Sequence, residues 1–443
     1  MWQQSWPIAL ANALGPVVGL VDTLVIGRFA GTLALAGIGL GAAIYGIVYW
    51  GFGFLRMSTA GLAAQSDGAN DERAVQAHIR RAVPLGIGIG LAVLALQALL
   101  LPLILAVYTA DATLEAEALT YIRARLWGLP ATLGGIALMG WFVGLGQAGR
   151  AFRLQLAINL VNAPLSFLFV AVFGWGIAGA GWSSAIAEWV GLLAGLALAA
   201  GLVRRRGGRV RLSRAELLDR TQLRALGTAN TNIFIRTAAL VFGFNWFANA
   251  AAKEGEVFLA GNHILMQMVT LIALVLDAYA HTAESAAGSA YGSGQRARFD
   301  RAVRLTVEFS ALSALALSAL ILFGGPHLID IMTTEASVRA SARTFLPYCA
   351  LVPVAGFAAY HLDGIFIGTT ATRQMRNASL AALAVYIGTH LALEPKFGPH
   401  GIWIAFLVYY LARAVTLGAY FPRLRHELKL SEPSVTVQAR PPI

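Results

Sequence analysis

Residues 83–108 read VPLGIGIGLAVLALQALLLPLILAVY and contain no charged side chain. A helix needs about 20 mostly apolar residues to cross the hydrocarbon core of a bilayer, so this stretch predicts a transmembrane helix. Stretches of the same kind recur along the chain and predict an all-α integral membrane protein with twelve transmembrane helices. The expected spans are residues 7–27, 33–55, 83–108, 127–145, 154–173, 177–203, 228–250, 257–280, 303–326, 345–368, 378–394 and 401–421.

The overall composition favours the same class. The chain has 443 residues, of which 58% are hydrophobic and 12% charged, and its mean hydropathy is +0.67. A soluble domain is about 25% charged, so a single soluble fold is excluded. Cys349 is the only cysteine, which rules out an intrachain disulfide and a cysteine-based metal cluster.

The basic residues are distributed unevenly about the expected spans. One side of the membrane receives 24 of the 33 Lys and Arg residues, together with both termini and the Arg-rich segment 204–224, and the other side receives seven. Because basic loops stay in the cytoplasm, we expect both termini there, in a multi-pass protein of the inner or plasma membrane. This bias also explains the net charge of +11 without nucleic acid, and membrane lipids are the expected contacts of segment 204–224.

The two halves of the chain resemble each other at a nearly constant offset. Residues 142–144 read FVG and residues 366–368 read FIG, 224 positions apart, and Pro130 and Pro353 lie 223 positions apart. Six spans in each half give parallel repeats, as in carriers that work by alternating access. The expected domains are an N-lobe at 1–203, a cytoplasmic linker at 204–227, a C-lobe at 228–421 and a cytoplasmic tail at 422–443.

Several ionisable and amide side chains fall inside the expected spans. An ionised side chain in hydrocarbon is costly, so each is a candidate for a functional site or for a pair that joins helices. Asp277, His281 and Glu284 are spaced i, i+4, i+7 and share one helical stripe, although a helix end in cytoplasmic water is an equal alternative for the last two. Glu188 and Arg413 are also ionisable side chains inside expected spans, and each is a candidate for a functional site or for a pair that joins helices. The expected polar network comprises Asn12, Asn159, Asn162, Asn232, Arg236, Asp277, His281 and Glu284.

Asp22 is the first candidate for coupling transport to an ion. No basic residue follows it in its own helix before Arg28, and the repeat places Trp246 at its equivalent position. Asp22 therefore does not belong to the duplicated scaffold. Motifs such as Walker A or HExxH are missing from the sequence. We therefore expect a protein that is not an enzyme, needs no cofactor or metal and draws its energy from an ion gradient.

Four segments resemble the MATE (multidrug and toxic compound extrusion) family, in particular its DinF-like branch. They are GLVDTLVIGR at 19–28, TNIFIRTAAL at 231–240, LVLDAYAHTAESAAG at 274–288 and HLDGIFIGTTATRQMRNA at 361–378. The resemblance implies two six-helix lobes and a cation-coupled antiporter of amphipathic, often cationic, drugs or metabolites, acting as a monomer. It implies ion coupling through Asp22, which matches the family's first-helix aspartate, and through Asp363, the best match to a carboxylate of the C-lobe. The coupling ion would be H⁺ or Na⁺.

One segment departs from the family pattern. Many members have Asp-Pro in the fifth helix, whereas this chain has Ala163 before Pro164, so a proton site with two carboxylates is not expected. Asn159 and Asn162 could then hydrogen-bond to Asp22 or to the substrate. The alternatives are a flippase for lipid-linked precursors, a major-facilitator carrier, and a membrane-embedded enzyme or channel.

Overall fold

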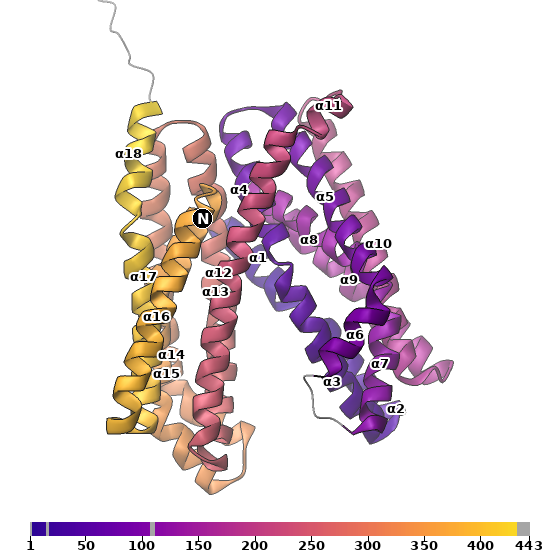
Figure 1. The fold of residues 1–443 in the computed structure, drawn as a ribbon, viewed down its shortest axis with the longest axis vertical. Helices are drawn as coiled ribbons and strands as arrows, with labels where there is room; N and C mark the ends of the chain where they lie inside the picture. Colours follow the sequence, from indigo (N-terminus) through magenta and orange to yellow (C-terminus); the bar gives the residue numbers. More distant parts are fainter. Residues whose placement is uncertain (1, 15–16, 107–110, 432–443) are drawn as a thin grey trace, which may run out of the picture.

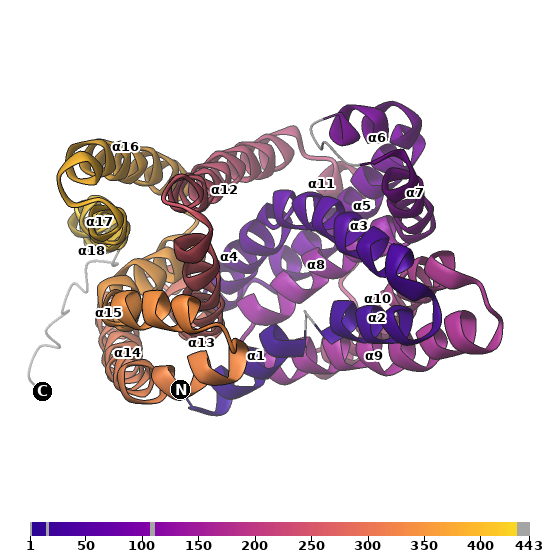
Figure 2. The ribbon, with the colours of Figure 1, turned by 90° about the horizontal axis from the view of Figure 1, so that it is seen from below.

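The computed structural model describes residues 2–14, 17–106 and 111–431, and within these ranges the chain forms helices and no strand. The helices form two groups that lie side by side (Figures 1 and 2). We call them the N-lobe, which contains α1 to α10, and the C-lobe, which contains α12 to α18. The short helix α11 lies in the linker between them. Residues 432–443 of the expected tail lie outside the described residues.

The N-lobe contains the first six spans, several of them built from two consecutive helices. Its helices are α1 (Trp2–Leu14), α2 (Val17–Phe29), α3 (Gly31–Gly51), α4 (Phe54–Gly68), α5 (Glu72–Ala95), α6 (Gln97–Leu105), α7 (Ala112–Leu126), α8 (Leu129–Gly144), α9 (Ala148–Phe167) and α10 (Gly176–Arg205), with a short π-helix, η1 (Leu168–Val172), after α9.

The C-lobe contains the other six spans as single long helices. The linker helix and the C-lobe helices are α11 (Arg214–Leu217), α12 (Arg220–Lys253), α13 (Glu256–Gly292), α14 (Arg296–Met332), α15 (Ala336–Gly368), α16 (Thr372–Phe397), α17 (Pro399–Gly418) and α18 (Phe421–Ser431). Apart from residues 15–16 and 107–108, which lie outside the described residues, the twelve expected spans fall on these helices, so the expected fold class is confirmed. The domain boundaries drawn from the sequence stay predictions.

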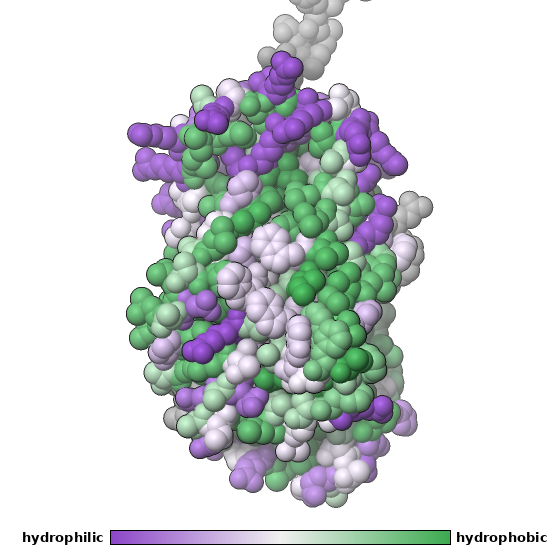
Figure 3. Space-filling view, turned by 90° about the vertical axis from the view of Figure 1, so that its right-hand side faces the viewer, coloured by the Kyte–Doolittle hydropathy of each residue, from purple (hydrophilic) through white to green (hydrophobic). Residues whose placement is uncertain are grey.

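Length and hydropathy identify the membrane-spanning part of the described chain. Nine of its helices are long and apolar enough to cross a membrane, and α7 and α8, which meet at a bend of 57°, give a tenth span. Gly128 lies at that bend, and Pro130 lies in the first turn of α8, where its missing N–H costs no helical hydrogen bond. Apolar residues cover the middle of the N-lobe face and polar residues gather at its ends (Figure 3).

Helices begin at the linker end of the molecule where short polar side chains cap them. The side chain of Asp71 accepts a hydrogen bond from the backbone N–H of Ala74 at the start of α5. Asp219 does the same for Gln222 at the start of α12, and Ser213 and Glu216 form a capping box on α11. Such caps satisfy N–H groups that have no partner within the helix. With Asp219 as its cap, α12 begins at Arg220, before the expected start of this span at residue 228.

The internal repeat is visible in how helices pack within each lobe. In the N-lobe a Cβ on Gly144 would lie 2.3 Å from the carbonyl oxygen of Ala60, so α8 and α4 are in backbone contact there. In the C-lobe a Cβ on Gly368 would lie 2.2 Å from the carbonyl oxygen of Glu284, which brings α15 against α13 in the same way. Both residues of the second contact lie 224 positions after those of the first. The offset seen in the sequence therefore reflects equivalent helix packing.

The same offset relates the two lobes where they touch. A Cβ on Gly68 would lie 1.8 Å from the carbonyl oxygen of Ser289, and a Cβ on Gly292 would lie 2.0 Å from that of Gln65. Gly292 and Ser289 are the repeat equivalents of Gly68 and Gln65, so each of the two contacts is the counterpart of the other. The helices α4 and α13 therefore cross about a local two-fold axis. Hydrogen bonds from Gln65 to the Gly368 carbonyl and from Ser285 to the Gly144 carbonyl join the lobes at this linker end. Toward the opposite end the lobes diverge (Figure 1).

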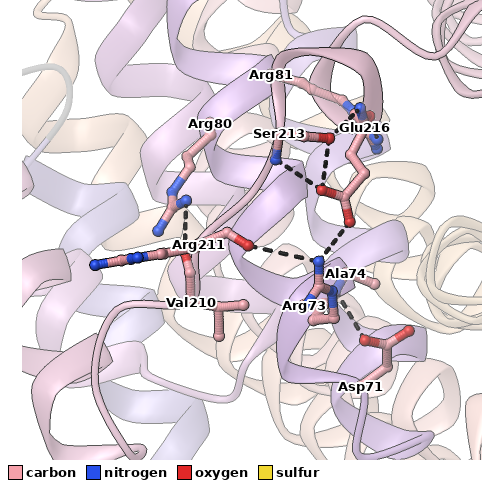
Figure 4. A network of polar contacts seen from close by, with 9 residues as sticks. All are labelled: Asp71, Arg73, Ala74, Arg80, Arg81, Val210, Arg211, Ser213 and Glu216. Carbon is pink, nitrogen blue, oxygen red and sulfur yellow. Dashed lines mark hydrogen bonds and ion pairs between the residues drawn. The ribbon is translucent and has the colours of Figure 1, made fainter.

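The linker is bound to the N-lobe along α5. Arg73 pairs with Glu216, and Arg80 donates to the Val210 carbonyl at 2.9 Å (Figure 4). Arg206 pairs with both Asp67 and Glu72. The linker is therefore ordered and bound to the surface of the N-lobe.

Candidate functional site

Asp22 lies on α2, buried at the centre of a polar cluster in the N-lobe. Its side chain is 0% exposed to solvent. The Ser184 hydroxyl, from α10, donates to one carboxylate oxygen at 2.7 Å, and the Asn162 amide, from α9, donates to the other at 3.3 Å. Three helices thus converge on one carboxylate, which makes Asp22 the best-defined buried acid of this lobe.

Arg125, which lies outside every expected span, is beside this carboxylate. Its Nη1 atom is 3.7 Å from Oδ2 of Asp22, and its side chain is only 13% exposed. The expected fourth span begins at residue 127 and so leaves Arg125 outside the membrane, but α7 begins at Ala112 and carries Arg125 in its last turn. Asp22 has no basic residue after it in its own helix before Arg28, but α7 supplies one from a neighbouring helix.

Aromatic residues hold the Arg125 guanidinium in place. It lies over the Tyr45 ring, 4.3 Å from the ring centroid, and donates to the Tyr121 hydroxyl at 3.0 Å. Stacking of this kind contributes about 1–2 kcal/mol when the cation is desolvated. Glu188 on α10 lies within electrostatic range of the same guanidinium. Arg125 therefore faces two acids, of which Asp22 is in direct contact.

The two asparagines of the fifth span have different partners. Asn162 contacts Asp22, Ser184 and, at 3.4 Å, Ser183, while its own side-chain oxygen has no hydrogen-bond partner among the described residues. Asn159 donates instead to the carbonyl oxygen of Leu14 at 3.1 Å. The predicted neighbour of Asp22 is thus Asn162, whereas Asn159 joins α9 to the end of α1. Ser184 could have been found from its i, i+4 spacing to Glu188 within an apolar span.

A second buried charge cluster lies in the C-lobe. Asp363 on α15 accepts a hydrogen bond from Arg236 on α12 and another, at 2.8 Å, from Arg413 on α17. Both guanidinium groups reach the same carboxylate oxygen, and the three side chains are 7–13% exposed. The direct partner of Arg236 is therefore Asp363 and not Asp277.

Arg413 has aromatic neighbours like those of Arg125. Its guanidinium carbon lies 5.6 Å from the ring centroid of Tyr360 and 5.7 Å from that of Tyr410. Asp277 lies within electrostatic range of Arg413 and Arg236 without a direct ion pair between described side chains. Each lobe thus contains an arginine that is held by tyrosines and paired with an aspartate.

The stripe on α13 connects the C-lobe cluster with the boundary between the lobes. Glu284, 0% exposed, pairs with Arg56 on α4 of the N-lobe at 3.2 Å. His281 lies one turn earlier and keeps Nδ1 without a hydrogen-bond partner among the described residues. Glu284 therefore joins the two lobes and is buried between them, within α13 rather than at a helix end in cytoplasmic water.

One predicted member of the polar network lies apart from these clusters. Asn232 donates to the Thr372 hydroxyl at 3.3 Å and accepts from Arg376 at 2.9 Å, which fixes the start of α16. The side chain of Asn12 lies outside the described residues. No group of three His, Cys, Asp or Glu that could hold a metal ion occurs in the described part of the chain.

Solved membrane-protein structures share this fold. One described as the outward-facing conformation of a multidrug resistance MATE family transporter superposes with a TM-score of 0.83 over 96% of this chain and 95% of that one, at 18% identity. The chain therefore has the same two-lobe fold as that protein.

Sequence comparisons give the family. The MatE family model matches residues 7–168 and 233–390, once in each lobe. DNA damage-inducible protein F of Escherichia coli (strain K12) is 30% identical over 426 residues, which cover 96% of this chain and 92% of that protein. The probable multidrug resistance protein NorM of Acinetobacter baylyi is 24% identical over 96% of this chain and 95% of its own length. The chain belongs to the MatE family.

Proposed function

We propose that this protein exports amphipathic, often cationic, compounds across the plasma membrane in exchange for H⁺, by alternating access of its two lobes. The observation that carries the proposal is the buried carboxylate of Asp22, in contact with Ser184, Asn162 and Arg125 in a MatE chain. The names of its relatives, among them multidrug resistance proteins, support the class of substrate. The positive-inside distribution of Lys and Arg supports cytoplasmic termini.

Protonation of Asp22 would change the balance of charge in the N-lobe. While Asp22 is ionised, it compensates the guanidinium of Arg125, and a buried cation without its partner is costly. A proton on Asp22 removes that compensation, so Arg125 would move toward Glu188 or toward water. Ion binding can shift the equilibrium between two arrangements only through such a difference between them. A cationic substrate would compete with both the proton and Arg125 for the carboxylate.

The surroundings of Asp22 favour H⁺ over Na⁺. A bound Na⁺ would lie next to the guanidinium of Arg125, and two like charges in a desolvated site repel strongly. A proton adds no separate ion to the site, because it only neutralises the carboxylate.

The C-lobe cluster argues against the flippase alternative. Arg236 and Arg413 both pair with Asp363, so neither arginine of that cluster is free to bind an anionic lipid precursor.

Flux measurements in proteoliposomes test the proposal. Efflux of a fluorescent organic cation should be driven by an imposed pH gradient and not by an imposed Na⁺ gradient. Asp22→Asn should abolish the pH-driven flux while the protein still inserts and elutes as a folded species. Asp330→Asn, in a surface ion pair with Arg343, is the matched control and should transport normally. Normal pH-driven efflux by Asp22→Asn would exclude Asp22 as the coupling site and make Asp363 the next candidate.

A further inference from the structure

A cavity of about 640 Å³ opens at the linker end between the two lobes. The N-lobe contributes α4 and α5 to its wall, and the C-lobe contributes the start of α12 and the turn from Thr370 to Thr372 between α15 and α16. The cavity is separate from the buried clusters around Asp22 and Asp363, none of whose members line it. The proposed export mechanism therefore leaves it without a role.

Three arginines line this cavity without a carboxylate partner among the described residues. Arg220 and Arg224 are exposed and lie one turn apart on α12. Arg81, on α5, donates to the backbone carbonyl oxygens of Glu216 and Leu217 rather than to an acid. The cavity is therefore cationic on walls that belong to different lobes.

Four acids at this end of the molecule have partners of their own. Glu216 pairs with Arg73, and Asp67 and Glu72 pair with Arg206. Asp219 accepts a hydrogen bond from the backbone of Gln222 as the cap of α12. The positive charge of the three arginines is thus not compensated by these neighbours.

The deeper wall of the cavity has a different character. Leu62, Ala82, Leu226 and Ala229 line it, with the hydroxyl-bearing side chains of Thr59 and Thr370 beside them. The expected hydrocarbon span of α12 begins at residue 228, so the arginines lie near the level of the lipid headgroups and the apolar wall lies toward the acyl chains. An occupant with an anionic head and an apolar tail matches this order of side chains.

We propose that this cavity binds the phosphate group of an anionic phospholipid, with its glycerol and first acyl carbons against the apolar wall. Arginine is well suited to phosphate because its planar group donates two parallel hydrogen bonds. Basic pockets between transmembrane helices on the cytoplasmic side are suited to anionic headgroups. A free phosphate or phosphorylated solute shares the head chemistry but leaves the apolar wall unfilled.

The bound lipid would stabilise one arrangement of the lobes. Arg81 belongs to the N-lobe and Arg220 and Arg224 belong to the C-lobe, so one phosphate would hold both walls together. Separation of the lobes at the linker end would break one set of these contacts. A ligand that binds one arrangement better than the other shifts the equilibrium toward it. Anionic lipid should therefore favour the arrangement closed at the linker end.

Titration of the full-length protein in detergent tests the site. Dihexanoyl phosphatidylglycerol should bind, with an apparent Kd measured by isothermal titration calorimetry, and dihexanoyl phosphatidylcholine should not. Arg220→Gln with Arg224→Gln should weaken binding roughly 30-fold, since a basic residue near an anionic lipid contributes about fivefold. The matched control is Arg301→Gln with Arg304→Gln, two exposed arginines of α14 at the same end of the molecule, and should bind as the parent does.

Three outcomes would overturn the proposal. The first is equal loss of affinity in the α12 and α14 double variants, since the effect would then be non-specific charge. The second is equal affinity for phosphatidylcholine. The third is displacement by inorganic phosphate at the same concentration as the lipid, which would assign the site to a free phosphate. The single variant Arg224→Gln, expected to lose about fivefold, serves if the double variant does not fold.

Discussion

Arg125 and Asp22 form a buried ion pair between α7 and α2, with Nη1 of the arginine 3.7 Å from Oδ2 of the aspartate. The distance exceeds that of a hydrogen bond, so the attraction is electrostatic, and the carboxylate keeps its hydrogen bonds for Ser184 and Asn162. The arginine can consequently leave without breaking a hydrogen bond to Asp22. In the proposed mechanism, a proton on Asp22 removes the charge that balances Arg125.

The first prediction concerns Arg125 as the residue that responds to protonation of Asp22. Arg125→Gln should reduce pH-driven efflux about tenfold or more, since the charge that senses the proton is lost. Arg123→Gln is the matched control, because Arg123 lies two positions earlier on α7 and is exposed. Initial rates in proteoliposomes under one fixed pH gradient measure the effect. Equal rates for the two variants would show that Arg125 has only a structural role.

The second prediction concerns the shared carboxylate of the C-lobe. Asp363→Asn leaves both Arg236 and Arg413 without their acid, whereas Arg236→Gln leaves the Asp363–Arg413 pair intact. Asp363→Asn should therefore lower the free energy of unfolding more than Arg236→Gln does. The loss in Asp363→Asn should be about 3–5 kcal/mol, the usual cost of leaving a buried charge unpaired. Thermal unfolding in detergent should rank Asp363→Asn below Arg236→Gln. The opposite ranking would contradict the shared pairing.

The third prediction concerns the ion pair between the lobes. Arg56→Gln leaves Glu284 buried without a charge partner and should favour separation of the lobes at the linker end. Ser285→Cys in a Cys349→Ala background reports on this, because Ser285 is buried against the Gly144 carbonyl. Arg56→Gln should raise its rate of labelling about fivefold, which corresponds to ~1 kcal/mol. Asp330→Asn should leave the rate unchanged, and an unchanged rate in Arg56→Gln would refute the role of this pair.

The fourth prediction follows from the reciprocal contacts of Gly68 and Gly292. An alanine at either position would place its Cβ about 2 Å from a carbonyl oxygen of the other lobe, and backbone atoms cannot yield at low cost. Both variants should open the linker end and increase labelling of Ser285→Cys to a similar extent. Gly88→Ala on α5 is the control, since its Cβ meets no atom within 4 Å. A response from only one of the two glycines would argue against the two-fold relation.

The fifth prediction concerns orientation in the membrane. Arg214→Cys in the linker should be labelled only from the cytoplasmic side, in a Cys349→Ala background. Thr334→Cys, after α14 at the opposite end of the molecule, should be labelled from outside intact cells. A membrane-impermeant maleimide distinguishes the two sides. Labelling of Arg214→Cys in intact cells would reverse the proposed topology.

Hydropathy predicted the long apolar helices of the described chain but not α7. A backbone in hydrocarbon must satisfy its own hydrogen bonds, so each long apolar stretch has to form a helix. The offset of 224 predicted the repeat, and the paired contacts of Gly144 and Gly368 show it in three dimensions. The composition of the spans also marked Asp22, Arg236 and Asp363, since charges inside apolar stretches are conspicuous.

The tertiary structure decided which of these charges meet. Arg125 was assigned to a loop because α7 is too polar to be recognised as part of a span, although burial of one face keeps it helical. Asp22 and Arg125 are far apart in the chain, as are Arg56 and Glu284, and hydropathy contains no information about which helix faces which. Hydropathy and the offset between the two halves predicted the long apolar helices, their repeat and the acids that are costly to bury. Only packing determined the partner of each acid, because pairing depends on the rotation and register of neighbouring helices, which side-chain contacts between distant segments set.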